Sequence, residues 1–190
     1  VDQPDQISYD LLTEQITCFD AEDGELTLNN FNGGVGDYIL EVYGPQGSLT
    51  NPVLINQSNT QYFENNLLPG QYSLYVTDSN LCQVNSVVNI MNPEILSGIV
   101  FSDSLNCYSS TDGSVEILIQ GGTSPFNIEF LNMNYSTSDS IYIISNIPAI
   151  EQESLIIYDN NNCSTNVSVD VYQPEPIVSS VINNNINCHG

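Results

Sequence analysis

One spacing, repeated along the chain, constrains the fold more than any other feature. Three prolines each precede a cysteine by 14 residues, the pairs being Pro4 and Cys18, Pro93 and Cys107, and Pro174 and Cys188. The last two prolines also follow a cysteine, Cys82 or Cys163, by 11 residues. Recurrent spacing indicates tandem repeats. We therefore expect the end of a preceding repeat or linker at 1–4, repeats at 5–93 and 94–174, and the start of a third repeat at 175–190.

Each complete repeat has the pattern of short strands separated by turns. In the segment 68–82, Pro69-Gly70 predicts a turn, and the alternation of Tyr72, Leu74 and Val76 with polar residues predicts a half-buried strand. A weaker copy of this segment lies at 153–163.

Further strands are predicted at 25–28, 38–43, 83–90, 114–119, 126–130 and 164–171. No segment has a convincing helical period. The pattern predicts an all-β chain of immunoglobulin-like or fibronectin III-like β-sandwich repeats. The constant number of residues across each junction favours a rod-like array.

The charge of the chain excludes several classes of partner. The 190 residues include 23 Asp and Glu but no Lys or Arg, which gives a formal net charge of −23. Phosphate recognition by basic side chains is therefore ruled out, so we expect no nucleic-acid partner. No segment approaches the roughly 20 apolar residues of a membrane span. Such a surface attracts cations, above all Ca²⁺, although acids also keep an exposed protein soluble.

The motifs resemble a known repeat family. Cys18 and Cys107 each begin a Cys-aromatic-x-x-x-Asp-Gly motif, the second repeat continues with Gly-Gly-x-x-Pro-aromatic, and 68–82 reads Leu-Pro-Gly-x-Tyr-x-Leu-x-Val-Thr-Asp-x-x-x-Cys. This pattern resembles the SprB repeat of very large surface adhesins in gliding Bacteroidota, over essentially the whole chain. The second repeat departs from it at Ile147-Pro148-Ala149, and Leu81 replaces the usual Gly.

The resemblance implies type IX secretion and a place in an extracellular filament at the cell surface, which would support adhesion and gliding motility. It implies adjacent repeats and an external surface or polysaccharide as partners, with the secretion and gliding machinery engaged by other parts of a larger parent protein. The missing start Met and signal peptide fit the expectation that the chain is a piece of such a parent. A ligand-binding module, or a subunit of a self-assembling sheath, is the alternative.

The five cysteines are disulfide candidates, because paired cysteines in an exported protein usually form bridges. No CxxC pair is present, and the single His189 makes a zinc site or a catalytic triad improbable. We expect no enzymatic activity. We favour pairing inside each repeat, Cys18 with Cys82 and Cys107 with Cys163. Strand parity leaves an alternative open, because seven strands would place Cys18 next to Cys163 of the following repeat.

Acidic turns and two short motifs complete the candidate sites. The calcium candidates are Asp20, Glu22, Asp23, Asp78, Asp112 and Asp159. Alternatively, these acids accept hydrogen bonds from the backbone of their own turns. No cofactor is required by this interpretation, with Ca²⁺ the one candidate. Ser104 and Ser140 lie in Asp-Ser-apolar motifs that resemble the O-glycan acceptor of this phylum.

Overall fold

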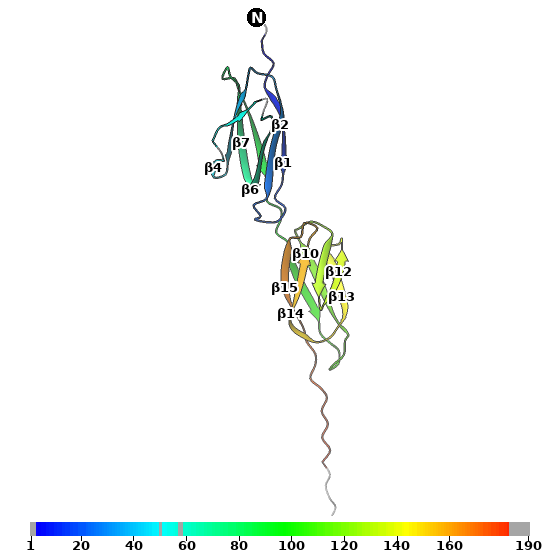
Figure 1. Ribbon diagram of the computed structural model, residues 1–190. Helices are drawn as coiled ribbons and strands as arrows, with labels where there is room; N and C mark the ends of the chain where they lie inside the picture. The colour runs from blue at the N-terminus through cyan, green and yellow to red at the C-terminus, as the bar shows by residue number, and fades with distance from the viewer. Residues whose placement is uncertain (1–2, 50, 57–58, 183–190) are drawn as a thin grey trace, which may run out of the picture. The chain divides into compact units, whose positions relative to one another are not determined.

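The computed structural model describes residues 3–49, 51–56 and 59–182, and every regular element in this part of the chain is a β-strand (Figure 1). The chain divides into two compact units. The first comprises Val1–Ser97 with the segments Gln120–Ser124 and Tyr158–Ser164, and the second comprises Gly98–Ile119, Pro125–Ile157 and Thr165–Gly190. No helix in the described residues could cross a membrane.

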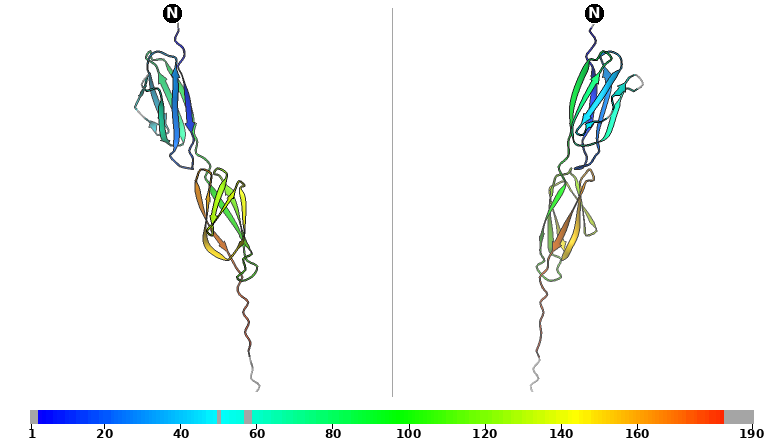
Figure 2. Two further views of the ribbon diagram at one scale, coloured as in Figure 1. Left: turned by 45° about the vertical axis from the view of Figure 1, so that its right-hand side comes forward. Right: turned by 90° about the vertical axis from the view of Figure 1, so that its left-hand side faces the viewer.

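The first sandwich consists of two antiparallel sheets (Figure 1 and Figure 2). One has the order β1-β2-β6, and the other has the order β4-β3-β7-β8 with β5 also paired to β3. The bounds are β1 Ser8–Glu14, β2 Gly24–Asn32, β3 Tyr38–Gly44, β4 Gly47–Ser48, β5 Val53–Ile55, β6 Tyr62–Leu67, β7 Gly70–Thr77 and β8 Gln83–Ile90. Because β4 and β5 pair with different parts of β3, they form one interrupted edge.

The second sandwich repeats this strand order. Its sheets are β13-β10-β9 and β12-β11-β14-β15. The bounds are β9 Ser97–Asp103, β10 Gly113–Gln120, β11 Phe126–Phe130, β12 Met133–Thr137, β13 Ile141–Ile147, β14 Ile150–Tyr158 and β15 Ser164–Val171. The predicted fold class is therefore confirmed: both sandwiches are immunoglobulin/fibronectin III-like. Each has seven strand positions in the described residues, when β4 and β5 are counted as one interrupted edge strand. The proposed boundary at Pro93 lies between β8 and β9.

The alternation read from the sequence produces the cores. In β7, Tyr72, Leu74 and Val76 are buried, and in β14 Leu155 and Ile157 are buried. Alternate residues of a strand face opposite sides of the sheet, so these side chains fill the space between the two sheets. The Tyr72 hydroxyl donates to the carbonyl of Leu68 at 2.7 Å, which supplies a partner for the polar end of a buried ring.

Each sandwich has a pair of adjacent glycines, Gly33-Gly34 or Gly121-Gly122, and the first glycine of each pair lies very close to the backbone of the segment before the first strand. Gly33 and Gly121 have φ values of 74° and 67°. A Cβ at these positions would lie 2.1 Å from the carbonyl oxygen of Gln6 and 2.2 Å from that of Ile95, respectively. Only glycine combines this backbone conformation with so close a contact. The glycine pairs thus hold the segment before each first strand against its sandwich.

Candidate functional site

The best-defined functional feature is a disulfide between Cys18 and Cys163, which are 145 residues apart in sequence. Cys18 lies in the loop between β1 and β2, and Cys163 lies in the turn between β14 and β15. The Asn161 side-chain amide donates to the carbonyl of Thr17 at 3.2 Å beside this bridge. The favoured pairings inside each repeat, Cys18 with Cys82 and Cys107 with Cys163, are therefore wrong, and the seven-strand alternative is correct.

The reason is the number of strands between the two cysteines of a repeat. Cys18 follows the first strand and Cys82 precedes the last one. With seven strand positions, the loop after the first strand and the turn before the last strand lie at opposite ends of a sandwich. Cys82 and Cys107 are both exposed and unbonded. Cys188 lies outside the described residues.

The turns that carry Cys82 and Cys163 are organised by a buried aspartate; we call residues 78–82 and 159–163 the Asp turns. The Asp78 carboxylate accepts hydrogen bonds from the backbone N–H groups of Val35, Asn80 and Cys82, each at 2.9 Å. Burial raises the pKa of Asp78, but these hydrogen bonds outweigh it and hold the pKa below its usual value.

Asp159 occupies the same position in the second Asp turn. Its carboxylate accepts from the N–H groups of Thr123 and Asn161 at 2.8 Å and of Cys163 at 2.9 Å. Both aspartates therefore satisfy backbone donors, which is the alternative that the sequence left open for them. In each Asp turn the aspartate thus binds the backbone of the cysteine four residues later.

The loops after the first strands use their acids in the same way; we call residues 17–23 and 106–112 the first loops. Asp23 accepts from the N–H and hydroxyl of Thr17, and Asp112 accepts from the N–H of Asn106, the side-chain amide of Asn106 and the Ser110 hydroxyl. The hydrogen bonds from Ser110 and Asn106 lower the pKa of Asp112.

The remaining candidates do not assemble into a metal site. Asp20 pairs with the Asn92 side chain, whose amide donates to it at 3.0 Å, and Glu22 is exposed. Among residues 3–49, 51–56 and 59–182, no three His, Cys, Asp or Glu side chains come together in a group that could hold a metal ion. Ser104 and Ser140 are both exposed, and their glycosylation stays a prediction.

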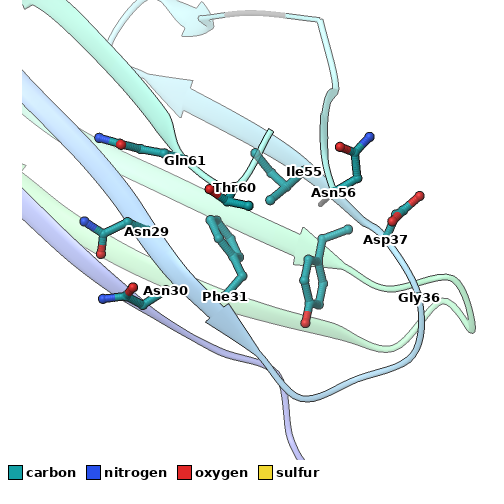
Figure 3. A pocket seen from close by; sticks show the side chains of 10 residues that line it. Asn29, Asn30, Phe31, Gly36, Asp37, Ile55, Asn56, Thr60 and Gln61 are labelled. Carbon is teal, nitrogen blue, oxygen red and sulfur yellow. The ribbon is translucent and has the colours of Figure 1, made fainter. Parts of the chain in front are cut away.

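A second feature, which the sequence did not predict, is an open groove of about 710 Å³ in the first sandwich (Figure 3). Residues of β2, of the start of β3 and of the segment around β5 line it, namely Asn29, Asn30, Phe31, Gly36, Asp37, Tyr38, Ile55, Asn56, Thr60 and Gln61. Figure 3 shows the Phe31 ring in the middle of the group, with Asn29 and Asn30 on one side and Asp37 and Asn56 on the other.

The chemistry of the groove combines fixed aromatic rings with polar side chains. Phe31 lies between Tyr9 and Tyr38, with ring centroids 5.5 and 5.6 Å away, and the Tyr38 hydroxyl donates to the carbonyl of Gly33 at 2.6 Å. The Asn29 side-chain oxygen is buried and accepts no hydrogen bond from any described residue. The groove thus offers an apolar surface, amide groups and one carboxylate to a ligand.

Two sequence signals point to this groove in hindsight. The first repeat is eight residues longer than the second, and the run Asn29-Asn30-Phe31 places two amides next to a ring. Neither signal alone predicts a groove, because the groove also depends on the interrupted edge formed by β4 and β5. No local sequence pattern predicts that edge.

Comparison with solved structures returns matches of low sequence identity and low TM-score. The matches include fibronectin(III)-like modules of Clostridium thermocellum CbhA (12% identity, 92% of this chain, 100% of that chain, TM-score 0.37) and two fibronectin type III domains of chicken tenascin (11%, 88%, 100%, 0.32). The amphioxus IgVJ-C2 molecule also matches (12%, 84% of this chain, 99% of that chain, 0.32). The sequence matches no protein-family model and no curated protein.

Proposed function

We propose that this chain is a structural segment, the stalk, of a large secreted adhesin filament at the cell surface, which supports adhesion and gliding motility. The observation that carries the proposal is the Cys18–Cys163 disulfide, which joins the first loop of one repeat to the Asp turn of the next. A covalent cross-link between residues of successive repeats, in addition to the peptide chain, is suited to a protein that bears tension.

Three further features support the same role. Disulfides are typical of exported proteins, and immunoglobulin-like or fibronectin III-like sandwiches are typically non-catalytic and common in extracellular proteins. The SprB-like motifs lie at the cysteine loops and turns, and these are the parts that the two repeats share. The absence of basic residues keeps the surface from binding nucleic acid or anionic membrane. We infer a non-enzymatic extracellular role with neighbouring repeats as the principal partners.

Deletion of whole repeats from the parent protein tests this proposal. A variant that lacks 5–93 or 94–174 should give shorter filaments with unchanged adhesion per filament, as imaged by electron microscopy and measured in a surface-attachment assay. A graded loss of attachment with each deleted repeat would contradict the stalk and favour the alternative of ligand binding by the repeats themselves. Lateral association of purified chains into sheets or tubes would favour a sheath.

The groove favours a second candidate function, binding of a neutral oligosaccharide. Its volume lies within the range of about 300–1,000 Å³ usual for small-molecule sites. Sugars present C–H faces that pack on aromatic rings such as Phe31, and hydroxyls that pair with side-chain amides such as Asn30. An anionic sugar is disfavoured because Asp37 lines the groove and the chain has no cation to balance it.

Calorimetric titration with maltohexaose and cellohexaose tests the second candidate. The substitution Phe31→Ala should weaken binding about fivefold or more, since stacking on a ring contributes on the order of 1 kcal/mol or more. Phe63→Ala is the matched control, because Phe63 is an exposed ring of β6 outside the groove. Equal binding by both variants, or no binding by the unmodified chain, would contradict it.

A further inference from the structure

Cys82 and Cys107 are the unbonded counterparts of the two bridged cysteines. Cys107 occupies the same position in the second repeat as Cys18 in the first, and Cys82 occupies the same position in the first repeat as Cys163 in the second. Both are exposed. An exposed cysteine alone carries no function, so the inference depends on how closely the surroundings of each match those of its bridged counterpart.

The two Asp turns match in backbone and hydrogen bonds. The N–H of Cys82 donates to Asp78 and the N–H of Cys163 donates to Asp159, each at 2.9 Å. The aspartate N–H donates in return to the cysteine carbonyl at 2.9 Å in both turns. The residue before the cysteine has a left-handed φ in both, 65° at Leu81 and 64° at Asn162. Cys82 is therefore held as Cys163 is held.

The two first loops match as closely. Asp20 and Ser109 have φ values of 59° and 58°. Their backbone N–H groups donate at 2.9 Å to the side-chain oxygen of the residue before each recurring proline, Asn92 in the first repeat and Gln173 in the second. The backbone of the loop that carries Cys107 thus matches that of the loop in which Cys18 forms its bridge.

The segment after Pro174 has the apolar pattern that also begins each of the two complete repeats. Three residues after the recurring proline, Ile7 and Leu96 are buried, at 6% and 7% exposed. The residue at the same position of the third copy, Ile177, is 101% exposed, and Val178, Val181 and Ile182 are more than four-fifths exposed. The segment 175–182 therefore has the apolar pattern of a first strand, and no sandwich among the described residues covers it.

We propose that a disulfide joins the first loop of every repeat to the Asp turn of the repeat that follows. Cys107 then pairs with the Asp-turn cysteine of a following repeat, and Cys82 pairs with the first-loop cysteine of a preceding repeat. The array becomes a series of sandwiches connected twice at each junction, once through the peptide chain and once through a bridge. This inference rests on the tandem-array part of the proposed function and is independent of adhesion.

Each bridge forms by thiol–disulfide exchange. Two thiols lose two protons and two electrons as the new S–S bond forms, and a disulfide donor, protein or small molecule, accepts both as its own S–S bond is reduced to two thiols. The exposure of Cys82 and Cys107 gives such a donor access.

Oxidation of the purified chain tests whether a first-loop cysteine pairs with an Asp-turn cysteine. Cys107 of one copy and Cys82 of another copy are the two cysteines of such a junction. The chain carries Cys188→Ser to remove the remaining thiol, and it is incubated with oxidised and reduced glutathione in 0.5 M NaCl, which screens the repulsion between chains of charge −23. Non-reducing electrophoresis should show a ladder of end-to-end oligomers. Peptic digestion and mass spectrometry identify each bridge, since trypsin has no Lys or Arg to cut.

The yield of the Cys82–Cys107 disulfide should exceed the yield of each disulfide between like cysteines, Cys82–Cys82 or Cys107–Cys107, by about tenfold. This ratio corresponds to a preference of about 1.4 kcal/mol. Cys82→Ser and Cys107→Ser should each abolish the ladder, while the Cys18–Cys163 bridge persists in both variants. A statistical mixture of like and unlike bridges, or the absence of oligomers, would overturn the inference. Either result would leave the stalk and its deletion test untouched.

Discussion

The first loops, the glycine pairs and the Asp turns have matching hydrogen bonds in the two sandwiches, whereas the strands between them differ. After β11, the second sandwich has one continuous edge strand, β12, which pairs over Phe126–Phe130. After β3, the first sandwich has two short pieces, β4 and β5, that pair with separate parts of β3. The cysteine-bearing regions are thus constant, and the edge of the larger sheet varies.

This contrast separates two kinds of constraint on the chain. A bridge between successive repeats requires each first loop and each Asp turn to present a cysteine in one conformation, so their turn residues cannot vary freely. The edge strand is involved in no bridge, and edges tolerate short strands and interruptions. Ile55 and Asn56, in and after one piece of this interrupted edge, help to line the groove of the first sandwich. The regions that carry the cysteines are therefore the same in both sandwiches, and the region beside the groove is the one that differs.

The largest expected effect tests whether a bridged cysteine contributes more to the free energy of unfolding than its unbonded counterpart. Cys163→Ser removes a cross-link that closes a loop of 145 residues, which the chain-entropy model values at about 5 kcal/mol when both sandwiches are unfolded. Cys82→Ser changes the equivalent position in the other Asp turn and breaks no bridge. Denaturant unfolding of the oxidised chain should show a large loss for the first variant and a change within about 0.5 kcal/mol for the second.

An equal loss in the two variants would show that the cysteine side chain matters to its turn regardless of bonding. In that case the matching hydrogen bonds of the Asp turns, and not the disulfide, would account for the stability of both sandwiches.

The next effect tests whether the two cores are equivalent. Leu74 and Leu155 occupy the same position in β7 and β14, and both are completely buried. Replacement of either by alanine should cost about 2–5 kcal/mol, through lost apolar contact and the cavity that remains. Hydrogen exchange followed by mass spectrometry should show faster exchange in the mutated sandwich alone. Faster exchange in both would mean that they unfold as one cooperative unit.

The strands and cores could be predicted from the sequence because they depend on local patterns. Alternation in 72–76 places one set of side chains inside, and the Asp-x-x-x-Cys turn follows from residues that are neighbours in the chain. The partner of Cys18 could not be predicted in this way, because it depends on whether an odd or even number of strands separates the two cysteines. An interrupted edge such as β4–β5 makes that number ambiguous in the sequence.

The groove could not be predicted from the sequence for a related reason. Phe31 lies next to Tyr38 across a tight glycine turn, which a local reading can suggest, but Asn29 and Gln61 come together only through the pairing of β2 with β6. The sequence therefore indicated that the middle of the first repeat has extra residues, but it did not indicate that this region forms a groove.

A smaller effect concerns the protonation of the Asp turn. The pKa of Asp78 is lowered in the folded protein, so its contribution to stability is present above the unfolded pKa of about 3.9 and is lost as pH falls through the lower folded value. Acidification also relieves the mutual repulsion of 23 carboxyl groups, which opposes this loss. The difference in melting temperature between the unmodified chain and Asp78→Asn isolates the first effect, and it should shrink below about pH 4.

The smallest expected effect compares the two first loops as cation sites. The first repeat has Asp20, Ala21 and Glu22 where the second has Ser109, Ser110 and Thr111, so a calcium ion bound by these acids would stabilise the first sandwich alone. Asp20 and Asp23 are already paired with Asn92 and Thr17, and Ca²⁺ needs six to eight oxygen ligands. Each sandwich should therefore melt at the same temperature in EDTA and in 5 mM CaCl₂, as followed by hydrogen exchange. This calcium concentration lies above the dissociation constants of about 0.1–1 mM of weak extracellular sites. A rise confined to the first sandwich would mean that the loop rearranges around the ion, since a ligand stabilises only the state that binds it.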